Sequence, residues 1–166
     1  MNKENGKILI VDDDESVLMV SKYLLSQQFN EVITLSDPKL LNGNFNDKKF
    51  DVALLDMNYT IGSTSGQEGL DLLRMFNEKF PSTRVIMMTA YIDLDIAIRA
   101  IKEGADDFIV KPWDDTKFIS IVTSNFKLGP KPVTNVKTRT VTAVSDEQNK
   151  NEIKGGMPYA IARCII

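Results

Sequence analysis

The hydrophobic and polar positions of the chain follow two patterns that alternate. Five short apolar runs, rich in β-branched residues, are separated by longer stretches in which apolar residues recur every three or four positions. Such runs are typical of strands buried on both faces of a parallel sheet, and the stretches between them are typical of amphipathic helices. We expect strands at residues 7–11, 31–35, 51–55, 84–88 and 107–110.

This alternation predicts the fold class. Five strands that alternate with five helices favour a doubly wound α/β fold, with right-handed crossovers and helices on both faces of the sheet. The second helix is the least distinct, because the segment DPKLLNGNFNDKK (residues 37–49) is short and rich in Asn. We nevertheless expect a helix in that segment.

The composition changes near residue 127. Gly129, Pro130 and Pro132 interrupt the helical pattern, and the residues after them are polar without a sustained period. Because Gly and Pro disfavour a continuing helix, we divide the chain into one domain at residues 1–127 and a linker or poorly ordered tail at residues 128–166. Basic residues of this region, such as Lys131, are interpreted as part of a solvated linker.

Composition and charge exclude several classes of function. The 166 residues contain no His, which removes the commonest general base and the commonest ligand of transition metals. The net charge of -3 predicts no direct binding to nucleic acid. The apolar runs are far shorter than the roughly 20 residues of a membrane-spanning helix. The first residues show no secretory signal. We therefore expect a cytoplasmic protein that does not cross the membrane.

Polar side chains follow four of the predicted strands at the points where they end. Asp12 and Asp13 follow the first strand, Asp56 the third, Thr89 the fourth and Lys111 the fifth. Ligands of doubly wound sheets bind at the carboxyl ends of the strands. We therefore expect three carboxylates, a hydroxyl and an ammonium group to converge on one crevice.

This set of side chains indicates a metal-assisted phosphoryl site. Three carboxylates close together repel one another, and a bound Mg²⁺ ion with oxygen ligands usually offsets such repulsion. Lys111 supplies the opposite charge for a phosphoryl group and Thr89 a hydrogen bond. Carboxylates can accept a phosphoryl group as an acyl phosphate, and Asp56 holds the central position. The segment GSTSG (residues 62–66) lacks the Lys and Ser or Thr of a P-loop, which excludes a nucleotide cradle.

Four motifs, ILIVDDDE, VALLDMN, VIMMTAY and FIVKPW, resemble in order and spacing the receiver domain of two-component response regulators. The resemblance covers about residues 7–126 and implies a flavodoxin-like (βα)5 fold with strand order 2-1-3-4-5. The extended segment NYTIGSTSGQEGL and the sequence KPWD are similar to receivers of NtrC-type, sigma-54-dependent transcription activators.

The resemblance also implies a role for each residue of the site. Asp56 is the expected phosphoacceptor, and Mg²⁺ is the expected cofactor. The remaining expected roles are metal ligation by Asp12, Asp13, Asp56 and the carbonyl of Asn58, phosphate binding and switching by Thr89, Lys111 and Phe108, and a cis peptide bond before Pro112.

The function that follows from the resemblance is a phosphorylation-dependent switch rather than an enzyme. The domain would take its phosphoryl group from a histidine kinase and would catalyse only its own phosphorylation and dephosphorylation. Phosphorylation would change the face formed by the fourth helix, fifth strand and fifth helix, through which the domain would form a homodimer. This change would serve to regulate transcription.

Two alternatives remain at the level of the sequence. The segment LLDMNYT also resembles the nucleophile motif of haloacid-dehalogenase-type phosphatases. That family places a second carboxylate where this chain has Asn58, and an amide cannot transfer the proton. The phosphatase alternative also leaves Asp12 and Asp13 unexplained. The other alternative is an interaction module whose site does no chemistry, although no residue of the expected site is missing.

Overall fold

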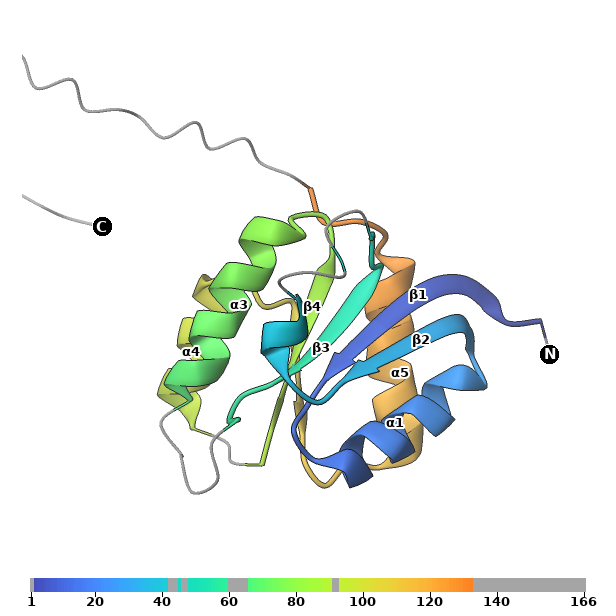
Figure 1. The fold of residues 1–166 in the computed structure, drawn as a ribbon, viewed down its shortest axis with the longest axis horizontal. Helices are drawn as coiled ribbons and strands as arrows, with labels where there is room; N and C mark the ends of the chain where they lie inside the picture. The colour runs from blue at the N-terminus through green and yellow to red at the C-terminus, as the bar shows by residue number, and fades with distance from the viewer. Residues whose placement is uncertain (1, 42–44, 46–47, 60–65, 91–92, 133–166) are drawn as a thin grey trace, which may run out of the picture. The chain divides into compact units, whose positions relative to one another are not determined.

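The computed structural model describes residues 2–41, 45, 48–59, 66–90 and 93–132. These residues form one parallel sheet of five strands in the order β2-β1-β3-β4-β5, with helices on both of its faces (Figure 1). The predicted fold class and strand order are therefore confirmed. The elements in chain order are β1 Glu4–Val11, α1 Glu15–Ser26, β2 Phe29–Leu35, η1 Pro38–Leu40, β3 Val52–Asp56, α3 Gln67–Lys79, β4 Arg84–Thr89, α4 Leu94–Lys102, β5 Asp107–Val110 and α5 Asp115–Lys127.

The segment that was expected to form the second helix is described only in part, so the expectation stays a prediction. Its described part contains the 3-10 turn η1 and, directly after it, the α-helical residue Leu41; the N-cap of η1, Asp37, accepts a hydrogen bond from the backbone of Lys39. Pro38 suits the first position of such a turn, because its missing N–H needs no partner there. Residues 42–44 and 46–47 lie outside the described part of the chain, so four α-helices are described where five were expected.

The sheet separates two hydrophobic cores, because successive side chains of a strand point to opposite faces. α1 and α5 cover one face, and α3 and α4 cover the other (Figure 1). The first core contains Ile8, Ile10, Leu18, Leu25, Val52, Leu54, Ile86, Met88, Phe118 and Val122. The second contains Leu9, Val11, Ala53, Leu55, Leu70, Leu73, Phe76, Val85, Met87 and Ala100. All five residues of β3 are buried, as expected for the central strand.

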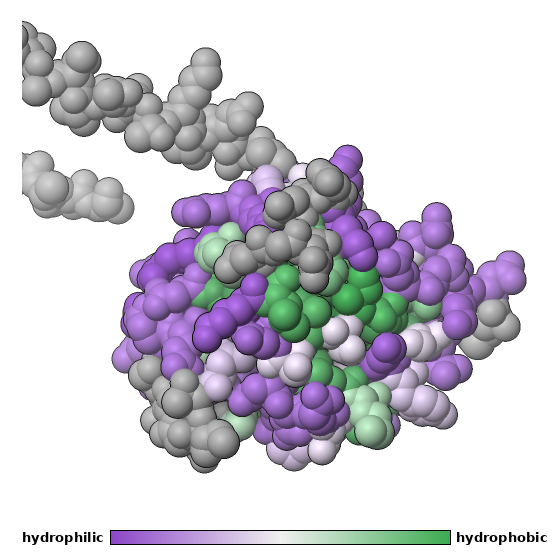
Figure 2. All heavy atoms as spheres, viewed as in Figure 1, coloured by the Kyte–Doolittle hydropathy of each residue, from purple (hydrophilic) through white to green (hydrophobic). Residues whose placement is uncertain are grey.

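The outer surface is mostly polar. Figure 2 shows hydrophilic residues over much of the visible face and hydrophobic residues gathered near its centre, where Figure 1 places β2, η1 and β3. Among the described residues, no helix combines the length and the apolar character that crossing a membrane requires.

The chain is anchored where it leaves α5. The helix ends at Lys127, and Gly129 adopts a left-handed conformation (φ +70°), in agreement with the predicted helix stop. The Lys131 ammonium group then forms an ion pair with Asp106 at 2.8 Å and donates to the carbonyl of Gly104 at 2.6 Å. The interpretation of Lys131 as part of a solvated linker is therefore wrong, because this side chain is held against the turn before β5.

Candidate functional site

The acidic residues gather at the carboxyl ends of β1 and β3. Val11 pairs with Leu55 in the parallel register, so the next residues, Asp12 and Asp56, lie side by side. Oxygen atoms of Asp12, Asp13 and Asp56 all lie within 4.8 Å of one another. Asp12 is fully buried and Asp56 is 5% exposed, whereas Asp13 is exposed. The predicted convergence of three carboxylates at one edge of the sheet is thus seen in the structure.

Lys111 reaches this cluster from the end of β5. Its Nζ atom lies 2.6 Å from Asp12 Oδ2 and 2.6 Å from Asp56 Oδ1. The backbone N–H of Lys111 donates to the carbonyl of Thr89 at 2.8 Å, and the Lys111–Pro112 peptide bond is cis. One ammonium group thus bridges two carboxylates whose parent strands are far apart in sequence.

Burial and charge alter the acid–base properties of this group. Burial, together with the negative charge of Asp56, raises the pKa of Asp12 to about 6, although its contact with Lys111 opposes the rise. Burial would lower the pKa of Lys111, but its bonds to Asp12 and Asp56 raise that pKa above its ordinary value. The lysine therefore stays charged, and it offsets only part of the repulsion between the acids.

Thr89 and Phe108 lie on the neighbouring strands β4 and β5. Thr89 is buried at the last position of β4, and Phe108 is half-buried and packs against the core on the side of α3 and α4. Both residues line a small, mostly apolar cavity of about 90 Å³ that also contacts the first turns of α4. The structure therefore places a hydroxyl and an aromatic ring on one cavity beside the first turns of α4.

A hydrogen-bonded junction connects the end of β3 to the start of α3. Asn58 donates its backbone N–H to Asp56 Oδ2 at 2.9 Å, and its side-chain Oδ1 accepts from the backbone of Gly66 at 3.2 Å. The backbone N–H of Tyr59 donates to Glu68 Oε2 at 3.1 Å. This junction brackets residues 60–65, which lie outside the described part of the chain.

Gly69 completes the junction through a close approach of two backbones. Its N–H donates to the carbonyl of Met57 at 3.0 Å. A Cβ atom at this position would lie only 2.6 Å from the backbone of Met57, so α3 can approach β3 this closely only with Gly there.

The sequence reasoning did not identify Tyr59 or Glu68 as members of the site. The Tyr59 hydroxyl donates to the carbonyl of Val11 at 3.3 Å, and burial beside the charges of Asp56 and Asp12 raises its pKa well above the usual value for tyrosine. No local pattern distinguishes these two residues, since each is recognised only by its partner in the fold.

A parallel sheet of this order, with acids, a hydroxyl and a lysine at its carboxyl ends, defines a class of α/β proteins built to handle a phosphoryl group. Within that class the chain belongs to the response regulator receiver domain family, whose family model matches residues 8–123. Receiver domains are not conventional enzymes. This assignment sets aside the phosphatase alternative.

Relatives of known function are larger transcription regulators. The chain is 34% identical over 122 residues to the response regulator protein PilR of Pseudomonas aeruginosa, covering 74% of this chain and 26% of that protein. It is 32% identical over 149 residues to the transcriptional regulatory protein ZraR of Klebsiella oxytoca, covering 88% and 32%. The chain thus spans about a quarter to a third of the length of these relatives.

Solved structures agree with the family assignment. The N-terminal signal receiver domain of a two-component response regulator from Bacteroides fragilis is 40% identical, with a TM-score of 0.65 and coverage of 74% of this chain and 98% of that one. The BeF3-activated receiver domain of DrrB is 28% identical, with a TM-score of 0.63 and coverage of 75% and 99%.

Proposed function

We propose that Asp56 is the phosphoacceptor and that Mg²⁺ binds at Asp12, Asp13 and Asp56 together with the main-chain carbonyl of Asn58. The observation that carries this proposal is the contact of one lysine with two of three clustered carboxylates at the carboxyl ends of β1 and β3. Carboxylate and carbonyl oxygens suit a hard divalent cation, so the residues present fit Mg²⁺. When bound, the ion would neutralise the charge that an incoming phosphoryl group meets.

The chain's own residues would assist the transfer as follows. An Asp56 oxygen forms a bond to phosphorus while the bond from phosphorus to the donor atom breaks in line with it, and the donor keeps the electron pair. Lys111 is already positioned at 2.6 Å from Asp56, where it would pair with a phosphoryl oxygen. Thr89, at the end of the neighbouring strand, would donate its hydroxyl to another oxygen of the same group.

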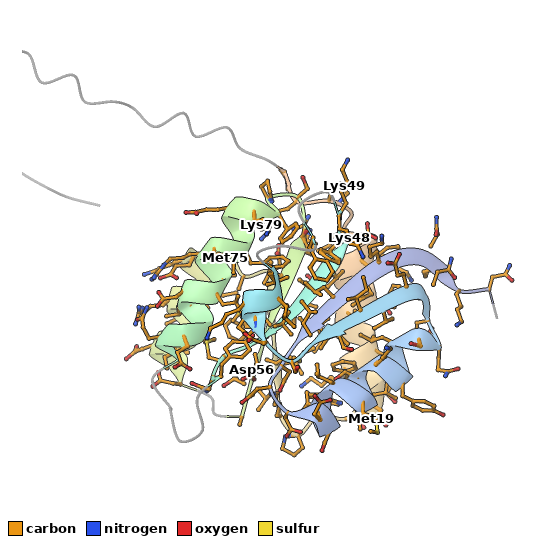
Figure 3. The ribbon with its side chains drawn as sticks, viewed as in Figure 1. Met19, Lys48, Lys49, Asp56, Met75 and Lys79 are labelled. Carbon is orange, nitrogen blue, oxygen red and sulfur yellow. The ribbon has the colours of Figure 1, made fainter. Side chains whose placement is uncertain are left out.

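The donor that fits best is the phosphohistidine of a histidine kinase. The 166 residues contain no His, so the phosphoryl group must come from another protein or from a small acyl phosphate. α1 offers a docking surface next to the site, since Met19 is 72% exposed and Tyr23 is 68% exposed. In Figure 3, Met19 is labelled on α1 in the lower part of the view, below and to the right of Asp56. Exposed apolar residues of this kind favour a protein partner.

The readout we propose is a shift between two packed states. An acyl phosphate on Asp56 would draw Thr89 toward it and would let Phe108 turn into the cavity of about 90 Å³ beside α4. The face of α4, β5 and α5 would then change. This face carries the exposed apolar side chains of Leu94, Ile101 and Val110, which suit a homodimer. Analytical sedimentation of the protein with beryllofluoride should show dimers, and Ile101→Asp should abolish them. A wild-type protein that is monomeric both with and without beryllofluoride would exclude this surface as a dimer interface.

The role of the whole protein follows from the relatives. We propose that the chain is the cytoplasmic receiver, at residues 1–127, of a transcription regulator of the sigma-54-dependent type, with residues 128–166 as the linker toward its output. PilR, ZraR and NtrC of Proteus hauseri, which is 29% identical over 119 residues, support this proposal. With a net charge of -3, the chain itself would not bind nucleic acid.

Phosphorylation of the purified chain tests the proposal. With acetyl phosphate and Mg²⁺, intact-mass spectrometry should show one alkali-labile phosphoryl group that is absent in Asp56→Asn and absent with EDTA. Asp71→Asn is the matched control, because Asp71 is an exposed acid of α3 that is not a member of the cluster. Labelling of neither the wild type nor the control, with Mg²⁺ bound, would refute the switch and would leave an interaction module.

A further inference from the structure

The start of α3 holds the one peptide unit that the proposed metal site needs. The backbone N–H of Tyr59 and the carbonyl of Asn58 belong to the same peptide, and the Glu68 carboxylate accepts a hydrogen bond from that N–H at 3.1 Å. We propose that Glu68 is a positioning residue that sets the direction of the Asn58 carbonyl, an inference that rests on the proposed Mg²⁺ site.

The geometry of the peptide bond fixes the direction of the Asn58 carbonyl relative to the Tyr59 N–H. A trans peptide is planar, so its N–H and its C=O point in opposite directions. Lys111–Pro112 is the only cis bond among the described residues, so the Asn58–Tyr59 peptide is trans. Once Glu68 holds the N–H on its own side, the carbonyl of Asn58 must point away from Glu68.

Other bonds prevent the peptide from rotating. The backbone N–H of Asn58 itself donates to Asp56 Oδ2 at 2.9 Å, and the side-chain Oδ1 of Asn58 accepts from the backbone N–H of Gly66 at 3.2 Å. The side-chain oxygen is therefore engaged in closing the loop, whereas the main-chain carbonyl is the group that the proposed site uses. Gly69, bonded to the carbonyl of Met57 at 3.0 Å, keeps the first turn of α3 at the correct distance.

Glu68 acts through this bond rather than as a ligand. The acidic cluster found among the described residues consists of Asp12, Asp13 and Asp56 and does not include Glu68. The Glu68 side chain is half-buried at the second position of α3, where a carboxylate is also favoured by the helix dipole. A positioning role predicts that the hydrogen-bond acceptor matters and that the charge does not.

The test compares two substitutions that separate the acceptor from the charge. Glu68→Gln keeps an acceptor oxygen and removes the charge, whereas Glu68→Ala removes both. Asp71→Ala, in the next turn of α3 and exposed, removes the same charge without touching the peptide. Mg²⁺ affinity is measured by titrating the full chain with MgCl2 and following amide chemical shifts by NMR, and hydrogen exchange reports on the Tyr59 amide.

We expect Glu68→Ala to weaken Mg²⁺ binding by about three- to tenfold, the range of one hydrogen bond, and to speed exchange of the Tyr59 amide. Glu68→Gln and Asp71→Ala should stay within about twofold of the wild type. Equal affinity of Glu68→Ala and the wild type would overturn the inference, as would an equal loss in Glu68→Gln and Glu68→Ala. Failure of the wild type to bind Mg²⁺ would instead refute the proposed metal site itself.

Discussion

Asp12 should make the metal-free protein less stable as the pH rises toward neutrality. Its carboxyl group is fully buried, and its pKa is raised from 3.8 to about 6 by burial and by the charge of Asp56. The folded protein therefore keeps the Asp12 proton at pH values where the unfolded chain has released it. This group stabilises the fold fully below pH 3.8, and its contribution is lost as the pH rises through about 6.

The size of the effect follows from the shift. A change of the pKa from 3.8 to about 6 corresponds to about 3 kcal/mol of unfolding free energy over the whole range. About 2 kcal/mol of this falls between roughly pH 4.5 and pH 7.5. Asp12→Asn keeps an oxygen that can accept from Lys111 but has no proton to lose. The variant should therefore lack this part of the pH dependence and should be the more stable protein at neutral pH without metal.

Urea unfolding followed by circular dichroism, with EDTA present, measures this difference. The free energy of the wild type minus that of Asp12→Asn should fall by about 2 kcal/mol between roughly pH 4.5 and pH 7.5. Asp71→Asn, which changes an exposed acid, should run parallel to the wild type. Parallel curves for the wild type and Asp12→Asn would refute the reasoning. Added MgCl2 should restore stability to the wild type more than to the variant, because a ligand that binds only the folded state stabilises it.

Three further changes test other parts of the structure. Asp106→Asn should lower the unfolding free energy by about 2 kcal/mol, since it breaks the ion pairs with Lys131 and Arg84 in a partly buried setting. The bonds to Lys131 lower the pKa of Asp106 despite its burial, so in urea titrations the loss should shrink as the pH falls below about 4; a constant loss would contradict this role. Gly69→Ala should lower the unfolding free energy by about 2 kcal/mol or more, because its Cβ would lie 2.6 Å from Met57; an unchanged midpoint in urea would show that α3 can move aside. Tyr23→Ser on α1 should slow phosphoryl transfer from a kinase by about tenfold and leave the rate with acetyl phosphate unchanged; equal rates from the kinase would exclude this docking surface.

The sheet and the position of the acidic cluster could be predicted from the amino-acid sequence. Each strand is marked by an apolar run, because a parallel strand that is buried on both faces contains almost only apolar residues. The meeting of Asp12, Asp56 and Lys111 could also be predicted, although Lys111 and Asp12 are 99 residues apart, because parallel strands end at the same edge of the sheet.

The contacts made by the connecting segments could be seen only in the folded protein. The sequence favoured a solvated linker position for Lys131, yet this residue pairs with Asp106. Nothing in the sequence marked Glu68, which accepts a hydrogen bond from the backbone of Tyr59. The physical reason is the same in each case. The period of hydrophobic residues is a local signal that repeats along a whole helix or strand. A single hydrogen bond or ion pair between connecting segments instead depends on which donor and acceptor the fold brings within about 3 Å of each other.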